Sequence, residues 1–184
     1  MLTLLLGVLG AAAVARARGG RLETLADTRL RYAPLLVAGL GLQVLFAAWS
    51  PGWLSAQEEL AVVLWSNLAV VLFIALNRQL PGMPLMALGL ALNVFVIASN
   101  GAMPVSERAS DLAGIPSAPD ASALKHELLG PETQLPWLGD VIPLPRLGEV
   151  LSVGDVVLIA GTIRLIYARM TAKEEGLRAP EVSG

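Results

Sequence analysis

Long blocks of apolar residues constrain this sequence more than any other feature. A helix needs about 20 largely apolar residues to cross the ~30 Å hydrocarbon layer of a bilayer. Five blocks approach that length, at about 1–15, 33–49, 60–76, 83–100 and 150–167. They are apolar all round and lack the charged face that a soluble helix presents to water.

The predicted fold class is therefore all-α, an integral membrane helical bundle with five transmembrane helices. Hydrophobic residues make up 55% of the chain, above the roughly 45–50% of soluble domains. A soluble all-helical bundle is the alternative that the missing charged faces oppose. We expect a single membrane domain over 1–170, with an extracytoplasmic loop at 101–149, and a polar cytoplasmic tail at 171–184.

The distribution of positive charge predicts the orientation. Ala13-Val14-Ala15 imitates a signal-peptide cleavage site, but no Lys or Arg precedes the first block, where a signal peptide carries its charge. We therefore expect a first spanning helix with its N-terminus outside. The resulting N-out/C-in topology places ten basic residues in the cytoplasm and three outside. The cytoplasmic set is Arg16, Arg18, Arg21, Arg29, Arg31, Arg78, Arg164, Arg169, Lys173 and Arg178, and the outer set is Arg108, Lys125 and Arg146.

Two of the blocks align without a gap at a shift of fifty residues. Pro34–Ala48 reads PLLVAGLGLQVLFAA, and Pro84–Ala98 reads PLMALGLALNVFVIA. Pro, Gly and amide positions coincide, with Gln43 opposite Asn93. The match favours a parallel duplication of a two-helix hairpin, to which a fifth helix is added. Chance similarity between apolar segments is the alternative.

The loop at 101–149 is long and rich in proline. Loops of this length that lack regular structure are usually functional or disordered, and we expect this one to be ordered. One short helix is predicted within it, capped by Asp120 and ending near Leu129, before Gly130-Pro131.

Three amides, Gln43, Asn67 and Asn93, interrupt the apolar blocks. An unpaired polar group costs several kcal/mol in hydrocarbon, so each amide needs partners. Hydrogen bonds between helices are the structural interpretation. The functional interpretation is a polar pocket at mid-depth that holds a small ligand.

Four residues are candidates for a pocket at the outer face: Asn100, Met103, Asp140 and Asp155. The two carboxyl groups could act as acid and base, but Asp155 also suits a role in capping the last helix. His126 is interpreted as an ordinary surface residue. No catalytic residue, cofactor or metal site is predicted, because the chain has no cysteine and one histidine.

Several segments resemble a family of small bacterial multi-pass membrane proteins that is catalogued as a domain of unknown function. The resemblance covers nearly the whole chain and implies a location in the bacterial cytoplasmic (inner) membrane, without an activity, cofactor or partner. Its most specific motifs are Asn100-Gly101-Ala102-Met103-Pro104 and Ser152-Val153-Gly154-Asp155. The others are Gly19-Gly20-Arg21-Leu22, Asn77 to Gly82, Asn93, and Leu138-Gly139-Asp140-Val141-Ile142.

Three functions are compatible with these features. A non-enzymatic accessory, scaffold or binding protein needs no catalytic constellation and is preferred. The alternative is a small-molecule transporter or ligand-binding bundle; an enzyme at the membrane edge, using Asp140 and Asp155 on a lipid-linked substrate, is less favoured. The expected partners are the lipid bilayer and another membrane protein, or a second copy packed through Gly39, Gly41 and Gly89. The net charge of −2 gives no reason to expect nucleic acid.

Overall fold

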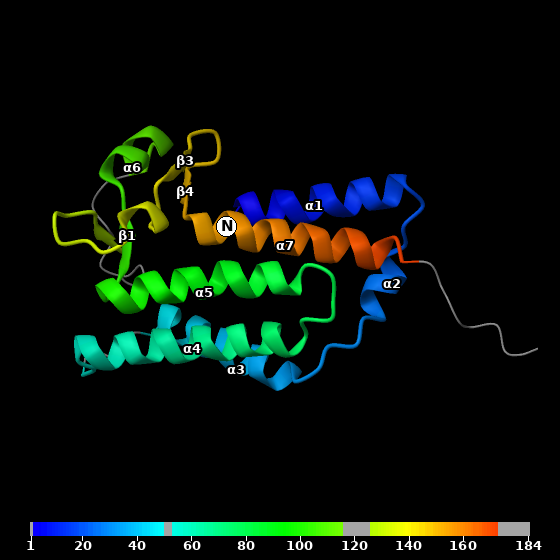
Figure 1. Cartoon of the computed structure of the whole chain (residues 1–184), viewed down its shortest axis with the longest axis horizontal. Helices are drawn as coiled ribbons and strands as arrows, with labels where there is room; N and C mark the ends of the chain where they lie inside the picture. The colour runs from blue at the N-terminus through cyan, green and yellow to red at the C-terminus, as the bar shows by residue number, and fades with distance from the viewer. Residues whose placement is uncertain (1, 50–52, 116–125, 173–184) are drawn as a thin grey trace, which may run out of the picture.

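Five long helices dominate the computed structural model, which describes residues 2–49, 53–115 and 126–172. Each lies within about four residues of an apolar block in the sequence, and they run alternately in opposite directions (Figure 1). Their bounds are α1 Leu2–Ala17, α3 Ala33–Ala48, α4 Ala56–Leu76, α5 Met83–Asn100 and α7 Val153–Met170. A short helix, α2 (Leu22–Ala26), follows α1.

Local signals in the sequence set several of the helix ends. Ser55 and Ser152 each form a capping box, in which the serine side chain and an acidic side chain three residues later satisfy backbone N–H groups at the start of α4 and α7. Proline lies in the first turn of α3 and of α5, where its missing N–H leaves no bond unmade. Gly101 ends α5 at a φ of 81°, a conformation that favours glycine.

The long helices pack as a curved row in the order α3, α4, α5, α7, α1. In Figure 1, α1 accordingly lies beside α7 and far from α3. The predicted duplication requires a packed hairpin of α1 and α3 to match that of α4 and α5, and the described residues form no such hairpin. α1 and α3 are consecutive long helices that do not pack on each other, because residues 18–32 carry the chain past the end of the bundle.

Glycines bring α5 and α7 into backbone contact at two levels. A methyl group at Gly154 would overlap Asn93 Oδ1 and lie 2.6 Å from the Gly89 carbonyl oxygen. About two turns further along α7, a methyl group at Gly161 would lie 2.7 Å from Met86 N and 2.8 Å from the Gly82 carbonyl oxygen. Small residues permit such close approach between helices. Gly89 therefore packs against α7 within the chain, and the predicted self-association stays a prediction.

The second glycine proposed for self-association is also covered. A methyl group at Gly39 would lie 2.7 Å from the Val70 side chain and 2.8 Å from the Ser66 carbonyl oxygen, so Gly39 serves the contact between α3 and α4. Only Gly41 of the three predicted glycines has no atom within 4 Å of such a methyl group.

The segment between α5 and α7 folds over one end of the bundle. It contains β1 (Met103–Val105), α6 (Glu107–Ala113), β2 (His126–Leu128), a 3-10 turn η1 (Pro136–Leu138), β3 (Ile142–Leu144) and β4 (Glu149–Leu151). β1 pairs with β2 in parallel and β3 with β4 antiparallel. The chain is mostly helical, but the all-α prediction missed these three-residue strands. The helix predicted from Asp120 to Leu129 is wrong over His126–Leu128, where pairing with β1 prevails; residues 120–125 lie outside the described ranges.

The sides of the long helices expose large apolar residues. Val37 and Val44 on α3, Trp65 on α4 and Phe95 on α5 keep between 58% and 70% of their surface accessible. Most of the buried apolar residues in the described ranges form three small separate clusters rather than one core. This surface is unlike that of a helical bundle in water, where polar faces point outward.

In the described part of the chain, two helices are long and apolar enough to cross a membrane, judged by length and composition. They are Gln57–Leu76 and Met83–Asn100, with mean hydropathies of 2.2 and 1.7, and only 22% and 17% of these segments is buried. The other three predicted spans are too short or carry too many charged residues to count as such helices. α1 and α3 have 16 residues each, about 24 Å of helix, and α7 contains Asp155, Arg164 and Arg169.

The contact between α5 and α7 generates a prediction for stability. Gly154→Ala should lower the stability of the purified protein by about 1–3 kcal/mol, as overpacking does in tight interfaces. Gly41→Ala is the matched control, since its methyl group meets nothing, and it should leave the melting temperature unchanged or slightly higher. Thermal unfolding in detergent measures both, and an equal loss in the two variants would contradict the close contact.

Candidate functional site

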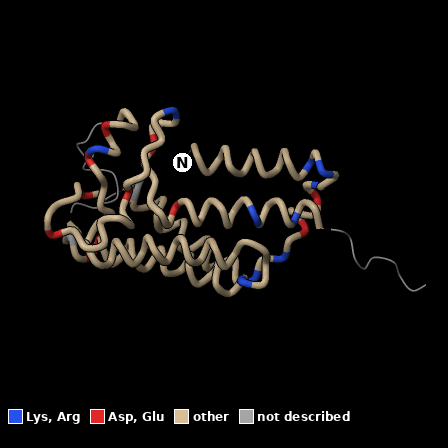
Figure 2. Tube along the Cα trace, turned by 45° about the horizontal axis from the view of Figure 1, so that its top comes forward, with Lys and Arg blue, Asp and Glu red and all other residues tan. Residues whose placement is uncertain are grey.

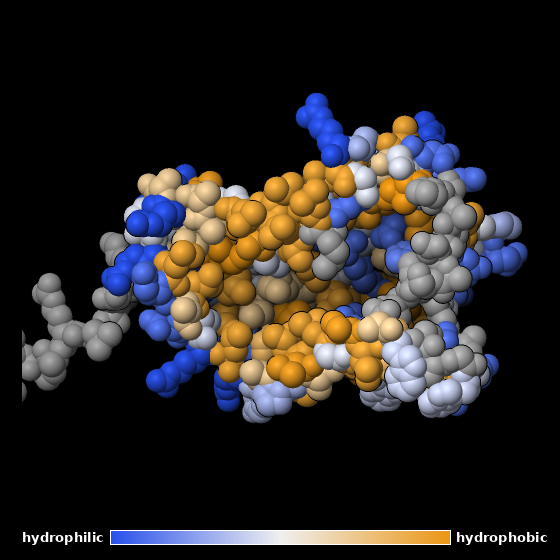
Figure 3. All heavy atoms as spheres, turned by 180° about the vertical axis from the view of Figure 1, so that it is seen from behind, coloured by the Kyte–Doolittle hydropathy of each residue, from blue (hydrophilic) through white to orange (hydrophobic). Residues whose placement is uncertain are grey.

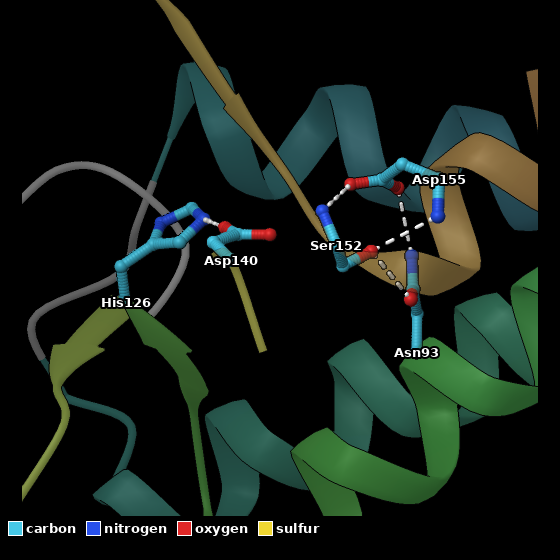
Figure 4. A network of polar contacts seen from close by, with 5 residues as sticks. All are labelled: Asn93, His126, Asp140, Ser152 and Asp155. Atoms are coloured by element: carbon cyan, nitrogen blue, oxygen red, sulfur yellow. Dashed lines mark hydrogen bonds and ion pairs between the residues drawn. The ribbon is translucent and has the colours of Figure 1, made fainter. Parts of the chain in front are cut away.

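A hydrogen-bonded group joins α5 to the start of α7 (Figure 4). Asn93 Nδ2 donates to Asp155 Oδ1 at 2.8 Å, and Ser152 Oγ donates to Asn93 Oδ1 at 2.9 Å. Asp155 Oδ2 accepts from Ser152 N at 3.0 Å, and Asp155 N donates to Ser152 Oγ at 2.9 Å. The capping box of α7 is thus extended to a neighbouring helix, and Asn93 uses both ends of its amide.

Asp140 lies close to this group and is held by its backbone. Asp140 N donates to the Pro104 carbonyl at 2.8 Å, and the Asp140 carbonyl accepts from Ser106 N at 2.9 Å. A methyl group at Gly139 would overlap the Pro104 carbonyl oxygen, so glycine permits the close approach of the two segments. These bonds fix Asp140 beside β1 although 35 residues separate it from Val105.

The Asp140 side chain faces His126. Asp140 Oδ2 lies 3.5 Å from His126 Nε2, and in Figure 4 the carboxyl group lies between the imidazole ring and the Ser152–Asp155 group. Only 8% of Asp140 is exposed. No residue in the described ranges donates a hydrogen bond to its Oδ1.

Of these residues, Asn93, His126, Asp140 and Asp155 line one cavity of about 240 Å³. Figure 3 shows a hollow in this face of the molecule, with hydrophilic side chains in its depth between rims of apolar ones. The hydrophilic lining consists of Gln43, Ser66, Asn67, Asn93, His126, Asp140 and Asp155. The apolar lining consists of Leu42, Phe46, Val62, Val63, Leu90, Ile97 and Met103.

Burial and charge alter the acid–base behaviour of two lining residues. Burial, together with the nearby Asp155 carboxylate, raises the pKa of Asp140 to about 7. Partial burial lowers the pKa of His126, and the Asp155 charge opposes that shift. Both effects follow from the cost of charge in a poorly solvated site. Near neutral pH the Asp140 carboxyl is therefore poised between its neutral and charged forms.

The structure brings together most of the site residues predicted from sequence. Gln43, Asn67 and Asn93, expected at mid-depth, share the cavity with Met103, Asp140 and Asp155, expected at the outer face. The amides differ in their bonding, however. Asn67 Nδ2 donates only within its own helix, to the Val63 carbonyl at 2.8 Å, whereas Asn93 bonds across to α7.

Asn100 does not line this cavity. Its side chain exchanges hydrogen bonds with the backbone of Gln134, at 3.0 Å and 2.8 Å, and so clamps the outer segment to the end of α5. Asn100 and Gln134 line a separate hollow of about 360 Å³ beside β2. The predicted pocket bounded by Asn100 together with Met103, Asp140 and Asp155 is wrong in that residue.

His126 and Ser152 are the site residues whose roles the sequence did not reveal. The Ser152-x-x-Asp155 spacing is a capping-box signal, but nothing local links Ser152 to Asn93. His126 reaches Asp140 only because β2 pairs with β1 and Asp140 bridges to Val105. No group of three or more His, Cys, Asp and Glu side chains in the described part of the chain is placed to hold a metal ion.

The two amides give a matched test of the hydrogen-bonded group. Asn93→Leu removes the bonds to Ser152 and Asp155, so that the Ser152 hydroxyl loses its acceptor and Asp155 Oδ1 loses its donor, which should cost about 1–3 kcal/mol of stability. Asn67→Leu removes one bond within a helix and should cost less than about 1 kcal/mol. Thermal unfolding in detergent compares the variants, and an equal or larger loss for Asn67→Leu would contradict this assignment.

Comparison with known proteins places the chain in a family. No curated protein and no solved structure matches it. A family model covers residues 27–167, a range that includes every described residue of the cavity and the glycines at which α5 and α7 meet. The chain belongs to the family of unknown function DUF5317.

Proposed function

We propose that this protein is a multi-pass membrane protein whose cavity binds a small amphipathic ligand. The observation that carries the proposal is the cavity itself, where three amides and two carboxyl groups from separate segments meet apolar walls. Pockets with a few convergent polar groups on an apolar background are typical of ligand sites. Binding without catalysis is the preferred form of this function.

The proposed topology has five membrane helices, N-out/C-in, in the bacterial cytoplasmic membrane that the resemblance implies. Charge supports the orientation: Figure 2 shows most Lys and Arg at the end of the bundle that carries α2, and most Asp and Glu at the other end. Basic residues concentrate on the cytoplasmic side of membrane proteins. The exposed apolar sides of α1, α3, α4 and α5 support burial in lipid.

Short helices are compatible with this topology. α1 and α3 fall about 6 Å below the ~30 Å of hydrocarbon, and local thinning of the bilayer or tilting of neighbours accommodates such mismatch at modest cost. Two of the three charged residues of α7 lie where they need not face lipid: Asp155 faces the cavity, and Arg169 donates to Thr28 Oγ1 at 2.9 Å. Arg164 is exposed on the side of the helix, and in this topology its long side chain extends toward the cytoplasmic head groups.

An enzyme acting on a lipid-linked substrate is the second candidate. The specific observation in its favour is that Asp140 and Asp155 line the same cavity beside His126, as acid–base chemistry requires. Asp155 counts against it, because both of its oxygens already accept hydrogen bonds within the α7 capping group.

Impermeant thiol labelling tests the topology, because the chain has no cysteine of its own. Glu132→Cys, in the outer segment, should react with a membrane-impermeant maleimide in intact cells. Arg78→Cys, in the turn between α4 and α5, should react only after permeabilisation. Equal labelling of both variants in intact cells, or the reverse pattern, would contradict the proposed orientation.

Ligand binding can be tested with a panel of ten-carbon amphiphiles of different charge: decylamine, decanol and decyl sulfate. Binding of radiolabelled probes to captured nanodiscs is measured against empty nanodiscs. At least one probe should bind saturably. Leu90→Trp, which fills the cavity from α5, should lower the affinity for that probe about tenfold or more. Leu88→Trp, on the exposed side of α5, is the control and should bind as the parent does. Absence of saturable binding for every probe would sink the proposal.

A further inference from the structure

We propose that the cavity selects a cationic amphiphile, with an alkylammonium head group between Asp140 and Asp155 and its alkyl chain leaving through the gap between α3 and α7. This inference rests on the proposed binding function and names its ligand class. It concerns the chemistry of the head group, so a free long-chain amine and an amine-bearing lipid both qualify.

The charge of the lining selects for a cation. Two carboxyl groups and one imidazole line the cavity, and no Lys or Arg does so among the described lining residues. The two carboxyl groups are close enough for Asp155 to influence Asp140. A cation between two like charges in a poorly solvated site relieves their repulsion, whereas an anion adds to it.

Asp140 offers an acceptor with no competing donor. Its side chain is 11% exposed, its Oδ1 accepts no hydrogen bond from the described residues, and its Oδ2 has only the 3.5 Å contact with His126. No buried side-chain oxygen or nitrogen of the described residues lacks a partner, so Oδ1 keeps accessible surface on which a ligand can donate. An ammonium group is a donor with three N–H bonds and no acceptor, which matches a site that presents carboxyl and amide oxygens.

The remaining walls and the size of the cavity indicate an alkyl chain. Seven of the fourteen lining residues are Leu, Phe, Val, Ile or Met. A volume of about 240 Å³ is below the usual 300–1,000 Å³ of small-molecule sites. The cavity therefore encloses a head group with the first part of its chain, and the rest of a long chain must lie outside.

The packing order of the helices provides the exit. α3 contacts α4, and α7 contacts α5 and α1, but α3 and α7 form no extensive contact within the described ranges. The hollow in Figure 3 opens on this side between two apolar rims. An alkyl chain leaving there would continue along exposed apolar side chains rather than enter water.

The acid–base state of Asp140 adds a pH dependence. A cation binds the ionised carboxylate, and the pKa of Asp140 is raised to about 7, so binding is favoured above that pH and is lost as the pH falls through it. Two other titratable groups face the site. Asp155 on α7 raises the pKa of Asp140 further, and His126 on β2 would oppose the cation once protonated.

The nanodisc assay separates this inference from the binding function. At pH 8, decylamine should bind at least about tenfold more tightly than decanol or decyl sulfate. Asp140→Asn should lower the affinity for decylamine about tenfold or more, the effect of losing one charged partner. The same variant should leave the affinity for decanol unchanged. Asp155→Asn is the second variant at the site, and Glu132→Gln, an exposed carboxyl outside the cavity, is the matched control. Retained melting temperature shows that each variant is folded.

Two further arms test the head group and the chain. Between pH 8 and pH 6 the affinity for decylamine should fall about tenfold in the parent and much less in Asp140→Asn, because about nine-tenths of a carboxyl with a pKa of 7 becomes protonated. Propylamine, which has the same head group and a short chain, should bind far more weakly than decylamine.

The outcomes are distinguishable. If decanol or decyl sulfate binds saturably with the same affinity as decylamine, and Asp140→Asn does not change these affinities, the cationic ligand is overturned but the binding cavity stands. Equal binding of propylamine and decylamine would overturn the amphiphile. Failure of every probe to bind saturably would overturn both this inference and the proposed function.

Discussion

The close backbone contact between α5 and α7 is the interaction on which the rest of the structure depends. Glycines at two levels let the helices approach until their carbonyl oxygens lie near the partner's Cα positions. At that separation the short Asn93 side chain reaches across to Ser152 and Asp155. With larger residues at Gly89 and Gly154 the helices would separate and the amide would lose its partners. The glycines thus determine where the polar side of the cavity forms.

Polar residues in this bundle fall into two groups by how completely they are bonded. Asn77 is fully buried and exchanges hydrogen bonds with the Arg31 backbone, at 2.8 Å in both directions, which ties the segment before α3 to the end of α4. Asn93 is bonded across to α7. Asp140 is less completely buried than Asn77, and its Oδ1 has no donor among the described residues. Because no buried side-chain oxygen or nitrogen of the described residues lacks a partner, this oxygen keeps accessible surface, which distinguishes Asp140 as a candidate ligand contact from the two structural amides.

The sequence allowed the long helices to be predicted because their signals are local. Apolar blocks, proline in the first turn, capping serines and Gly101 all act within a few residues. The packing order was not accessible in the same way: α1 precedes α3 in sequence but packs on α7. The three-residue strands were missed because their stability comes from pairing between distant segments, as for Met103 with His126.

The site was partly accessible for the same reasons. Amides within apolar blocks and acidic residues near the outer face stand out in the sequence because they are polar residues in or beside apolar segments. The structure places most of them around one cavity. Their grouping depends on long-range geometry. Asn100 bonds to Gln134 instead, and His126 joins the cavity through β2. His126 is exposed, as expected of a surface residue, but the fold places a carboxyl group 3.5 Å from its ring, and nothing local in the sequence indicates that neighbour.

The two carboxyl groups of the cavity are held by different parts of the chain. Asp140 is hydrogen-bonded through its backbone to β1, which follows the end of α5, and the next residue, Val141, donates from its backbone N to the Leu151 carbonyl just before α7. Asp155 belongs to the first turn of α7. The separation of the two charges is therefore set by how the outer segment is fastened to both helices at once, and Asn93 adds a side-chain hydrogen bond across the same boundary.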